Sequence, residues 1–314
     1  HNSKKVLDSF IKNRVSQSDF TDINGYGYYD GGRDKLEKIF AEVLDAEDSL
    51  VRPQIMSGTN AIALTLTGLL HHGDTLLSVS GLPYDSLRGI IGLSGNSKLS
   101  LKYNGVNYEQ IDLKDSDFDY DKIMQRIKEG GVTMVAIQRS RGYADRKSLT
   151  LNKIEKVVSL IKSIDKNVIL FCDNCYGELV EKHEPCYYGV DVVAGSLMKN
   201  LGGGVASSGG YVAGRADLVA EVAERLTSPC IGKELGANFN QNLSFYKGLY
   251  LAPNAVRNAL KTAAFAAYVL EKTGFSGISP RFDEERTDII QTVELSSEAN
   301  LVKFCQGMKE ASPV

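Results

Sequence analysis

Short apolar runs alternate in this sequence with segments whose apolar residues recur at helical spacing. The clearest case joins the run 132–137, the segment 152–164 and the run 168–172. Four apolar residues of the middle segment stand at i, i+3, i+4 and i+7, the spacing of one helix face: Ile154, Val157, Val158 and Ile161. Two short apolar runs joined by an amphipathic helix predict a β-α-β unit. The chain is therefore expected to have an α/β fold with a mainly parallel sheet.

The same pattern predicts further elements along the chain. Strands are expected at residues 74–80, 100–104, 190–194 and 210–213, and helices at 61–70 and 218–226. Asn152 and Glu155 form a cap-like N-x-x-E start for the helix of the β-α-β unit. Beyond Gly248, the pattern indicates a helix with Pro253 near its start that runs to about Lys272, then a strand at 288–295 and a helix at 297–310.

These elements divide the chain into three regions. We expect an N-terminal arm over residues 1–50, a major domain over 51–249, and a linker helix followed by the start of a smaller α+β domain over 250–314. One strand and one helix cannot enclose a core, so the smaller domain is expected to be incomplete in this sequence.

Composition and charge exclude several classes of function. The 36 Lys and Arg against 39 Asp and Glu give a net charge of −3, without the basic excess of a nucleic-acid-binding protein. No apolar run approaches the roughly 20 residues that a membrane span requires. The five cysteines are few for a disulfide-stapled secreted protein and are typical of a reducing compartment. We expect a cytoplasmic protein that acts on a small molecule.

One candidate phosphate site precedes the expected helix 61–70. Ser57, Gly58, Thr59 and Asn60 place hydroxyl and backbone N–H groups at the beginning of that helix. A helix N-terminus binds phosphate through its unpaired N–H groups and the positive end of its dipole. The alternative is an ordinary helix cap, for which the same residue types are preferred.

Two further candidates follow expected strands. Asp173 comes after the apolar run 167–170, at the end of a buried parallel strand, where α/β proteins gather ligands. Ser196 and Lys199 precede the glycines 202–204, and a crowded apolar position would disfavour the charged form of the lysine, as an amine nucleophile requires. The alternatives are an aspartate that caps a turn and a surface turn with a solvated lysine.

The order of the three candidates is that of pyridoxal-phosphate enzymes with the aspartate aminotransferase fold. The sequence resembles the methionine gamma-lyase-like, or aluminium-resistance, branch of the cystathionine beta-lyase relatives from about Asn24 to Ile290. Six motifs carry the resemblance: Asn24–Tyr28, Ser57–Asn60, Gly81–Tyr84, Gln138–Tyr143, Cys172–Gly177 and Gly195–Gly204. The resemblance implies a three-layer α/β/α major domain of fold type I.

The resemblance also implies the cofactor and its contacts. Pyridoxal 5′-phosphate would be held as an imine on Lys199, with Asp173 paired to the pyridine nitrogen and Tyr84 on the cofactor face. The other residues that the resemblance assigns to the cofactor are Ser57, Gly58, Thr59, Ser196, Gln138, Tyr26 and Tyr28. Either Tyr26 or Tyr28 would reach the phosphate of a neighbouring subunit in a homodimer or homotetramer.

The sequence departs from the better-studied cystathionine lyases at two places. Met198 stands where those enzymes have a phosphate-binding Ser or Thr. The region that supplies their substrate-carboxylate arginine has no counterpart, and neither Arg139, Arg141 nor Arg286 can be given that role from sequence.

The activity implied is a β- or γ-elimination on a cystathionine- or methionine-like L-amino acid, which yields a keto acid and ammonia. Two alternatives stay open: an aminotransferase or other α-carbon chemistry, and a non-catalytic protein of the same fold with a regulatory or stress-resistance role. Cys172-x-x-Cys175, with His183 and Cys186 nearby, raises a zinc alternative. No second C-x-x-C pair accompanies it, so no metal is expected.

Overall fold

The computed structural model describes residues 1–312, within which one mixed sheet contains seven strands in the order β1-β7-β6-β5-β4-β2-β3. The strands are β1 (Asp48–Arg52), β2 (Thr75–Ser78), β3 (Asn107–Gln110), β4 (Met134–Gln138), β5 (Ile169–Asp173), β6 (Val192–Ser196) and β7 (Gly210–Gly214). Strands β2 to β6 are parallel, whereas β7 is antiparallel to both of its neighbours. The expected α/β fold with a mainly parallel sheet is confirmed.

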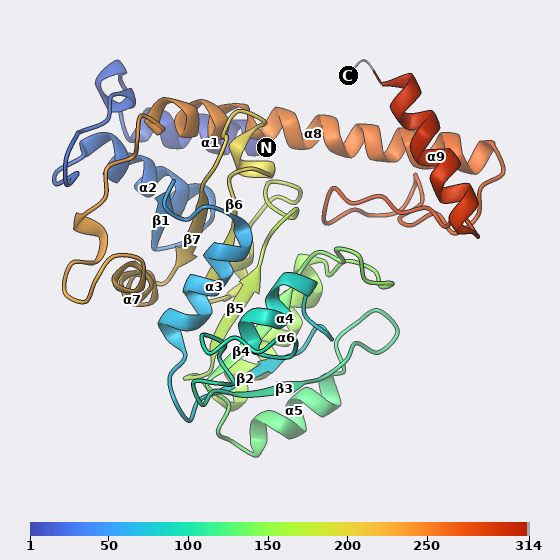
Figure 1. Cartoon of the computed structure of the whole chain (residues 1–314), viewed down its shortest axis with the longest axis horizontal. Helices are drawn as coiled ribbons and strands as arrows, with labels where there is room; N and C mark the ends of the chain where they lie inside the picture. Colours follow the sequence, from blue (N-terminus) through green and yellow to red (C-terminus); the bar gives the residue numbers. More distant parts are fainter. Residues whose placement is uncertain (313–314) are drawn as a thin grey trace.

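Helices cover both faces of this sheet (Figure 1). The α-helices are α1 (Asn2–Lys12), α2 (Gly31–Val43), α3 (Gly58–Leu69), α4 (Asp85–Ile91), α5 (Tyr120–Lys128), α6 (Leu151–Ile164), α7 (Ala216–Leu226), α8 (Asn242–Lys272) and α9 (Glu298–Ala311). Short 3₁₀ helices lie at Gln17–Phe20, Pro185–Tyr188, Asn200–Gly202 and Gly232–Glu234.

The sheet separates two hydrophobic layers, because successive strand residues point to opposite faces. Leu76 packs in the layer under α3, α4 and α7, whereas its neighbour Leu77 packs in the layer under α2, α5, α6 and the N-terminal half of α8. Both leucines are 1% exposed. This confirms the three-layer α/β/α arrangement.

The β-α-β unit is confirmed as β4, α6 and β5, but the expected cap of its helix is wrong. The N-cap of α6 is Thr150, whose side chain accepts a hydrogen bond from the backbone N–H of Lys153. Asn152 is exposed in the first turn of the helix. The hydroxyl of Thr150 therefore does the capping that we expected from Asn152 and Glu155.

The strand expected at 100–104 is also wrong. These residues form turns that bury Leu101, and the backbone N–H of Val106 donates to the carbonyl of Leu101. The strand at this edge is β3, whose residues Asn107–Gln110 are polar except for one tyrosine and lack a hydrophobic pattern. An edge strand is only partly buried, so its sequence carries a weak signal.

The C-terminal region differs from the expected strand and helix pair. Residues 288–295 form no strand, and Thr292 makes only an isolated bridge with Ser279. Thr287 and Asp288 instead bond the loop after β4: Asp288 accepts hydrogen bonds from Ser140 and Ser148, and Thr287 donates to the carbonyl of Leu149. Side-chain contacts with the major domain thus replace strand pairing.

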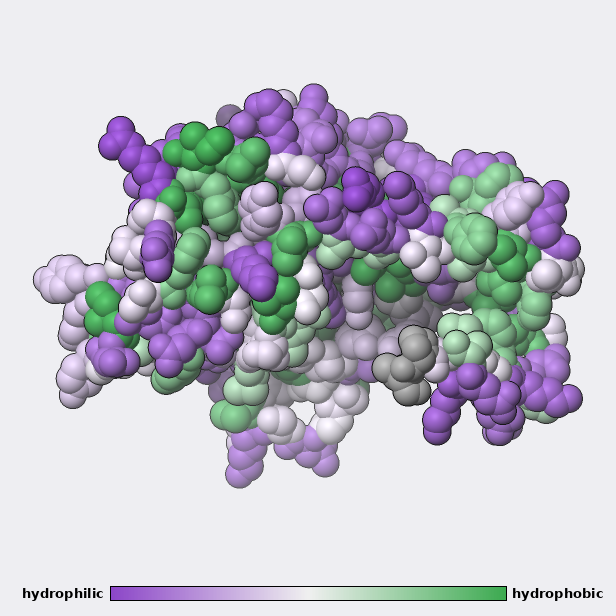
Figure 2. Space-filling view, turned by 90° about the horizontal axis from the view of Figure 1, so that it is seen from above, coloured by the Kyte–Doolittle hydropathy of each residue, from purple (hydrophilic) through white to green (hydrophobic). Residues whose placement is uncertain are grey.

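The two C-terminal helices extend past the sheet (Figure 1). Helix α8 begins at Asn242, so Pro253 lies inside it and not near its start, and α9 follows the expected helix 297–310 closely. Figure 2 shows hydrophobic side chains gathered at this end of the molecule. The exposed ones there include Phe265, Phe275, Leu301, Val302 and Met308. In residues 1–312, no helix is both long and apolar enough to span a bilayer.

The region 1–50 contributes much more than an extended segment. Leu36, Ile39, Phe40 and Val43 of α2 are each 0% exposed and belong to one of the two hydrophobic layers. Residues 48–52 form β1, which pairs with β7 at the edge of the sheet. Helix α2 and β1 are therefore part of the body that carries the candidate site.

A buried ion pair ties these segments together and gives a testable prediction for stability. Glu37 and Arg52 are 2% and 1% exposed at their side chains, with Oε1 of Glu37 2.7 Å from Nε of Arg52. Glu37→Ala should lower the free energy of unfolding by about 3–5 kcal/mol, because Arg52 would keep a buried charge without its partner. Urea denaturation measures this change, and Glu155→Ala, at an exposed position of α6, should leave stability within about 0.5 kcal/mol.

The pH dependence of this pair follows from the pKa of Glu37. Burial alone would raise it, but Arg52 and Lys233 hold the pKa of Glu37 below its ordinary value of 4.5. A carboxyl with a lowered pKa stabilises the fold above its unfolded-state pKa and loses that contribution as the pH falls through the folded-state value. The stability advantage over Glu37→Gln should be complete near neutral pH and shrink below about pH 4.5. An advantage that grows in acid would contradict this account.

Candidate active site

The carboxyl ends of β4, β5 and β6 meet at one edge of the sheet, because these strands are parallel and adjacent. Gln138 and Asp173 end β4 and β5 and stand opposite each other in the sheet register. Ser196 ends β6, and Lys199 follows it after two residues. The expected position of Asp173 at the end of a buried parallel strand is confirmed.

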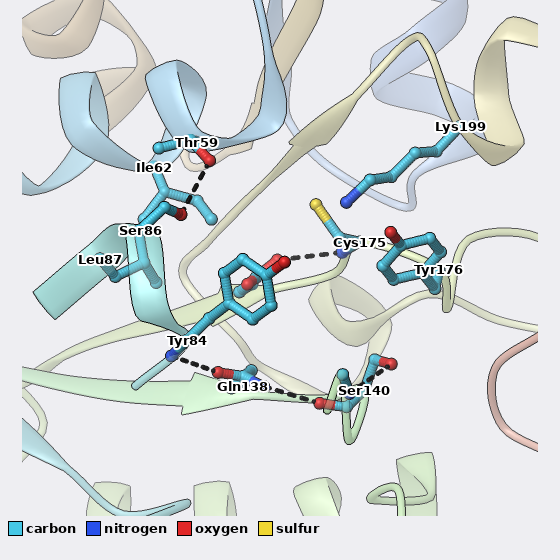
Figure 3. Close-up of a pocket in the computed structure, with 12 residues that line it drawn as sticks. Thr59, Ile62, Tyr84, Ser86, Leu87, Gln138, Ser140, Cys175, Tyr176 and Lys199 are labelled. Carbon is cyan, nitrogen blue, oxygen red and sulfur yellow. Dashed lines mark hydrogen bonds between the residues drawn. The ribbon is translucent and has the colours of Figure 1, made fainter. Parts of the chain in front are cut away.

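Five of the residues predicted for the site line one cavity at this edge: Thr59, Tyr84, Gln138, Asp173 and Lys199. Figure 3 shows Thr59 from α3, Tyr84 before α4, and Lys199 after β6 converging on it. Ser57, Gly58 and Ser196 lie next to this cavity in the sequence and in space, although they are not among its lining residues. Residues more than 100 positions apart are thus assembled by the sheet.

The N-terminus of α3 approaches β6 closely at Gly58. A Cβ atom at this position would lie 3.0 Å from Sγ of Cys175 and 3.1 Å from Cβ of Ser196. Ser57 caps the helix, and its hydroxyl accepts a hydrogen bond of 3.1 Å from the backbone N–H of Asn60. The hydroxyls of Thr59 and Ser86 are 3.0 Å apart beside them. This end of the cavity therefore combines a helix N-terminus with hydroxyl groups, a combination that suits phosphate.

Asp173 presents a carboxylate to the cavity with few partners. Its Oδ1 accepts a hydrogen bond of 3.1 Å from the backbone N–H of Cys175. Burial raises the pKa of Asp173 above its ordinary value, although the Cys175 N–H and the charge of Lys199 both act to lower it. A desolvated carboxylate of this kind is stabilised by a cation placed against it.

The ammonium form of Lys199 is not disfavoured, contrary to the expectation from its crowded position. Burial by itself lowers the pKa of Lys199, but Cys175, Tyr176 and Asp173 together raise it to about 12. The Nζ atom lies 3.9 Å from the ring centroid of Tyr176. The expectation was wrong because the strand-end turn surrounds the lysine with electron-rich groups, which favour the ammonium form.

Tyr84 and Gln138, which both line the cavity, are linked by a hydrogen bond. The backbone N–H of Tyr84 donates to Oε1 of Gln138 at 3.0 Å, and Nε2 of Gln138 donates to the carbonyl of Ser140 at 2.9 Å. The ring of Tyr84 stacks on Tyr143 with centroids 5.7 Å apart. The amide of Gln138 therefore positions both loops, and its direct contact with a cofactor stays a prediction.

Tyr26 and Tyr28 do not reach the cavity from within this chain. They are 76% and 46% exposed, and their ring centroids lie 6.3 Å apart in the loop before α2. Met198 is 49% exposed and is also outside the cavity lining. The role of the two tyrosines across a subunit boundary stays a prediction.

Arg139, Arg141 and Arg286, to which the sequence assigned no role, bond through their side chains to residues outside the cavity lining. Arg139 is 0% exposed and bonds Asn174 and Glu181. Arg141 donates to Ser279, and Arg286 donates to Gln291. The bond of Arg141 connects the loop after β4 with the C-terminal segment, those of Arg139 connect this loop with the residues after β5, and that of Arg286 lies within the C-terminal segment.

Sequence reasoning missed Cys175 and Tyr176 as members of the cavity. Both follow Asp173 in the turn after β5, and Tyr176 has a positive φ of 71°. A non-glycine residue in this region of the backbone is uncommon and marks positions where the surrounding structure imposes the conformation. The motif Asp173-Asn174-Cys175-Tyr176 was visible in the sequence, but the turn that directs the tyrosine into the cavity was not.

Cys172 and Cys175 are buried thiols, and Cys186 is partly buried. Burial raises the pKa of Cys172, Cys175 and Cys186 well above the ordinary thiol value. Their sulfurs form no disulfide. Within residues 1–312, no group of three His, Cys, Asp or Glu side chains is arranged to hold a metal ion.

Comparison with known proteins places these features in context. A family model described as methionine gamma-lyase matches residues 1–314. The uncharacterised protein YnbB of Bacillus subtilis (strain 168) is 46% identical over 315 residues, which span 100% of this chain and 74% of that protein. A solved structure from Listeria monocytogenes, provisionally described as a cystathionine beta-lyase involved in aluminium resistance, is 45% identical, with a TM-score of 0.97 over 100% of this chain and 77% of its own.

A more distant likeness concerns the fold alone. The Escherichia coli protein YhfS, described as pyridoxal-5′-phosphate dependent, is 20% identical, with a TM-score of 0.64 over 87% of this chain and 68% of its own. The likeness confirms the fold type I architecture that the resemblance implied.

Proposed function

This chain belongs to the methionine gamma-lyase family, and we propose that it is a pyridoxal 5′-phosphate-dependent carbon–sulfur lyase. The reaction proposed is β- or γ-elimination on an L-amino acid with a sulfur-containing side chain: the carbon–sulfur bond breaks, the sulfur leaves as a thiol, and one water converts the remaining imine into a keto acid and ammonia. The observation that carries the proposal is the meeting of Asp173, Lys199, Tyr84 and the N-terminus of α3 around one cavity. Family membership and the Listeria monocytogenes relative support the same class of chemistry.

The phosphate end of pyridoxal phosphate fits the N-terminus of α3. Gly58 leaves room there that any side chain would fill, since its Cβ would approach Cys175 to 3.0 Å. The N–H groups of the first turn and the hydroxyl of Thr59 can donate to phosphate oxygens. The helix dipole favours the negative charge at the same position.

The ring end fits Asp173 and Tyr84. Asp173 is a desolvated carboxylate with a raised pKa, and a protonated pyridine nitrogen is the kind of cation that would stabilise it. Tyr84 offers an aromatic side chain to the cavity, with its backbone held by Gln138. When bound, pyridoxal phosphate supplies an electron-withdrawing ring that stabilises negative charge on the α-carbon of an attached amino acid.

Lys199 has two tasks in this proposal. Its Nζ atom is the amine to which the cofactor would be covalently linked, and once free it moves the proton at the α-carbon of the substrate. The ammonium form cannot accept a proton, and Asp173 is one of the groups that raise the pKa of Lys199. A cation bound to Asp173 would neutralise that carboxylate and so favour the neutral amine.

The function is tested with the purified chain and added pyridoxal phosphate. Borohydride reduction followed by peptide mapping should place the label on Lys199, and L-cystathionine, L-cysteine or L-methionine should yield a keto acid and ammonia in equal amounts. Transfer of the amino group to an added keto acid would instead indicate an aminotransferase. Bound cofactor without turnover would indicate a non-catalytic protein, and failure to bind the cofactor would contradict the proposal.

Thr59→Ala gives a prediction for the phosphate end alone. Loss of one hydroxyl donor should weaken pyridoxal phosphate binding by about 3- to 10-fold, the effect of one hydrogen bond. Fluorescence titration of cofactor-free protein measures the dissociation constant. Thr67→Ala is the matched control, because Thr67 lies further along α3 and bonds the carbonyl of Ala63. Equal effects of the two substitutions would show that Thr59 makes no phosphate contact.

We also propose that the protein forms a homodimer or homotetramer. Exposed aromatic side chains surround the loop before α2: Tyr29 is 91% exposed, Tyr26 76% and Phe239 65%. Covering them by a second copy would remove apolar surface from water. Light scattering on the eluted protein should therefore report at least twice the chain mass, and a monomer that still binds cofactor would contradict the proposal.

A further inference from the structure

Tyr176 lies beside the amine of Lys199. The Nζ atom lies 3.9 Å from the centroid of the Tyr176 ring, within the range of a cation–π interaction. Figure 3 shows both side chains at the same side of the cavity, together with Cys175. Both residues line the cavity, so the interaction lies inside the candidate active site.

The backbone of Tyr176 is held in a conformation that serves this contact. Its φ of 71° lies in the left-handed region, where a bulky residue pays a steric cost. Asp173 accepts the N–H of Cys175, and the N–H of Gly177 donates to the carbonyl of Asn174, so the turn is fixed on both sides of Tyr176. Such strain at a cavity is retained where the surrounding structure enforces it.

Other titratable groups also face the amine. Asp173 and Cys175 belong to the same strand-end turn, Glu178 lies buried behind it, and Tyr84 faces the lysine from the position before α4. Asp173 acts by charge, but its carboxylate is the group that a bound cofactor would engage. The ring face of Tyr176 attracts the ammonium group whether or not Asp173 has another cationic partner. The quadrupole of the ring does not depend on the charge of Asp173.

We propose that Tyr176 is a positioning residue for Lys199, whose ring face holds the free ammonium group at the edge of the cavity. The inference rests on the proposed function in one respect. A free Lys199 matters for the reaction only if a substrate amine takes the place of the lysine on the cofactor. In that state the Tyr176 ring keeps Nζ beside the cavity and sets how readily the ammonium gives up its proton.

The test measures the protonation of Lys199 directly in the full chain freed of cofactor. Brief labelling with acetic anhydride across a pH series, followed by peptide mass mapping, gives an apparent pKa for each lysine. Exposed Lys98 serves as the internal reference. Tyr176→Leu removes the ring, and leucine tolerates the positive φ at this position no less well than tyrosine does. Tyr176→Phe keeps the ring face. Tyr103→Leu is the matched control, since Tyr103 is 63% exposed and outside the cavity.

Tyr176→Leu should lower the apparent pKa of Lys199 by roughly one unit, corresponding to a desolvated cation–π contact. Tyr176→Phe and Tyr103→Leu should leave it unchanged, and Lys98 should not shift in any variant. An unchanged Lys199 in Tyr176→Leu would overturn the inference, as would a Tyr176→Phe shift equal to that of Tyr176→Leu. Circular dichroism checks that each variant is folded.

The readout separates the inference from the proposed function. A Tyr176-dependent shift in a chain that never binds pyridoxal phosphate would support the inference and contradict the function. A chain that binds the cofactor and releases keto acid, but whose Lys199 labels identically in Tyr176→Leu, would support the function and contradict the inference.

Discussion

Lys199→Ala is expected to abolish formation of keto acid and ammonia, with a loss of at least about 10³-fold, within the range attributed to a positioned proton-transferring group. The substitution removes the one amine in the cavity lining, so no group of the chain at that position can move the α-proton. Pyridoxal phosphate should still bind through the N-terminus of α3 and Asp173. Borohydride treatment should then leave no label on the peptide that contains residue 199.

The matched control for this substitution is Lys147→Ala. Lys147 is 63% exposed at its side chain and pairs with Glu284, outside the cavity. Its removal should leave turnover and labelling of Lys199 within about twofold, as for most surface substitutions. Steady-state release of keto acid from L-cystathionine is the measurement. Turnover of Lys199→Ala at the wild-type rate would exclude Lys199 as the proton-moving group.

Asp173→Asn is expected to lower turnover by about 10²- to 10⁴-fold, the range of a group that stabilises charge in the transition state. The amide has the same shape as the carboxylate but cannot carry the negative charge that favours a protonated ring nitrogen. Its carbonyl oxygen can still accept the N–H of Cys175, so the turn after β5 should persist. Turnover with saturating cofactor measures the effect.

The same substitution should stabilise the cofactor-free chain at neutral pH. Burial raises the pKa of Asp173 above its ordinary value of 3.8, so the folded chain binds this proton more tightly than the unfolded chain. Such a group stabilises the fold in acid and loses that contribution as the pH rises through its folded-state pKa. Urea denaturation at pH 7 should therefore find Asp173→Asn more stable than the wild type.

Together the two measurements distinguish a catalytic role from a structural one. Substitution of a residue that serves folding should lower the stability and the activity of the chain together. Removal of an unfavourable charge that serves catalysis should instead raise the stability of the chain while its activity falls. Full turnover in Asp173→Asn, or a clear loss of its stability, would contradict the role proposed for the carboxylate.

The predicted elements differ in how well local pattern could reveal them. The run 168–172 is buried on both faces, and it corresponds to β5 within one residue at each end. Strand β3 lies at the sheet edge and is polar, so hydropathy pointed instead to Leu101, which is buried in a turn. In residues 288–295, apolar character indicated a strand, but the polar side chains of Thr287 and Asp288 anchor that segment to the loop after β4.

Local sequence determined which chemical groups the candidate site contains and which strand ends carry them. The order of a capped helix, an Asp after one buried strand and a Lys after the next is readable without any contact, because parallel strands deliver their carboxyl ends to one edge. Only the tertiary structure decided the environment of each group. The ammonium form of Lys199 is favoured because the turn after β5 brings Cys175, Tyr176 and Asp173 around its amine. The charge on a buried side chain depends on neighbours that the fold brings together, and the spacing of residues along the chain does not encode that environment.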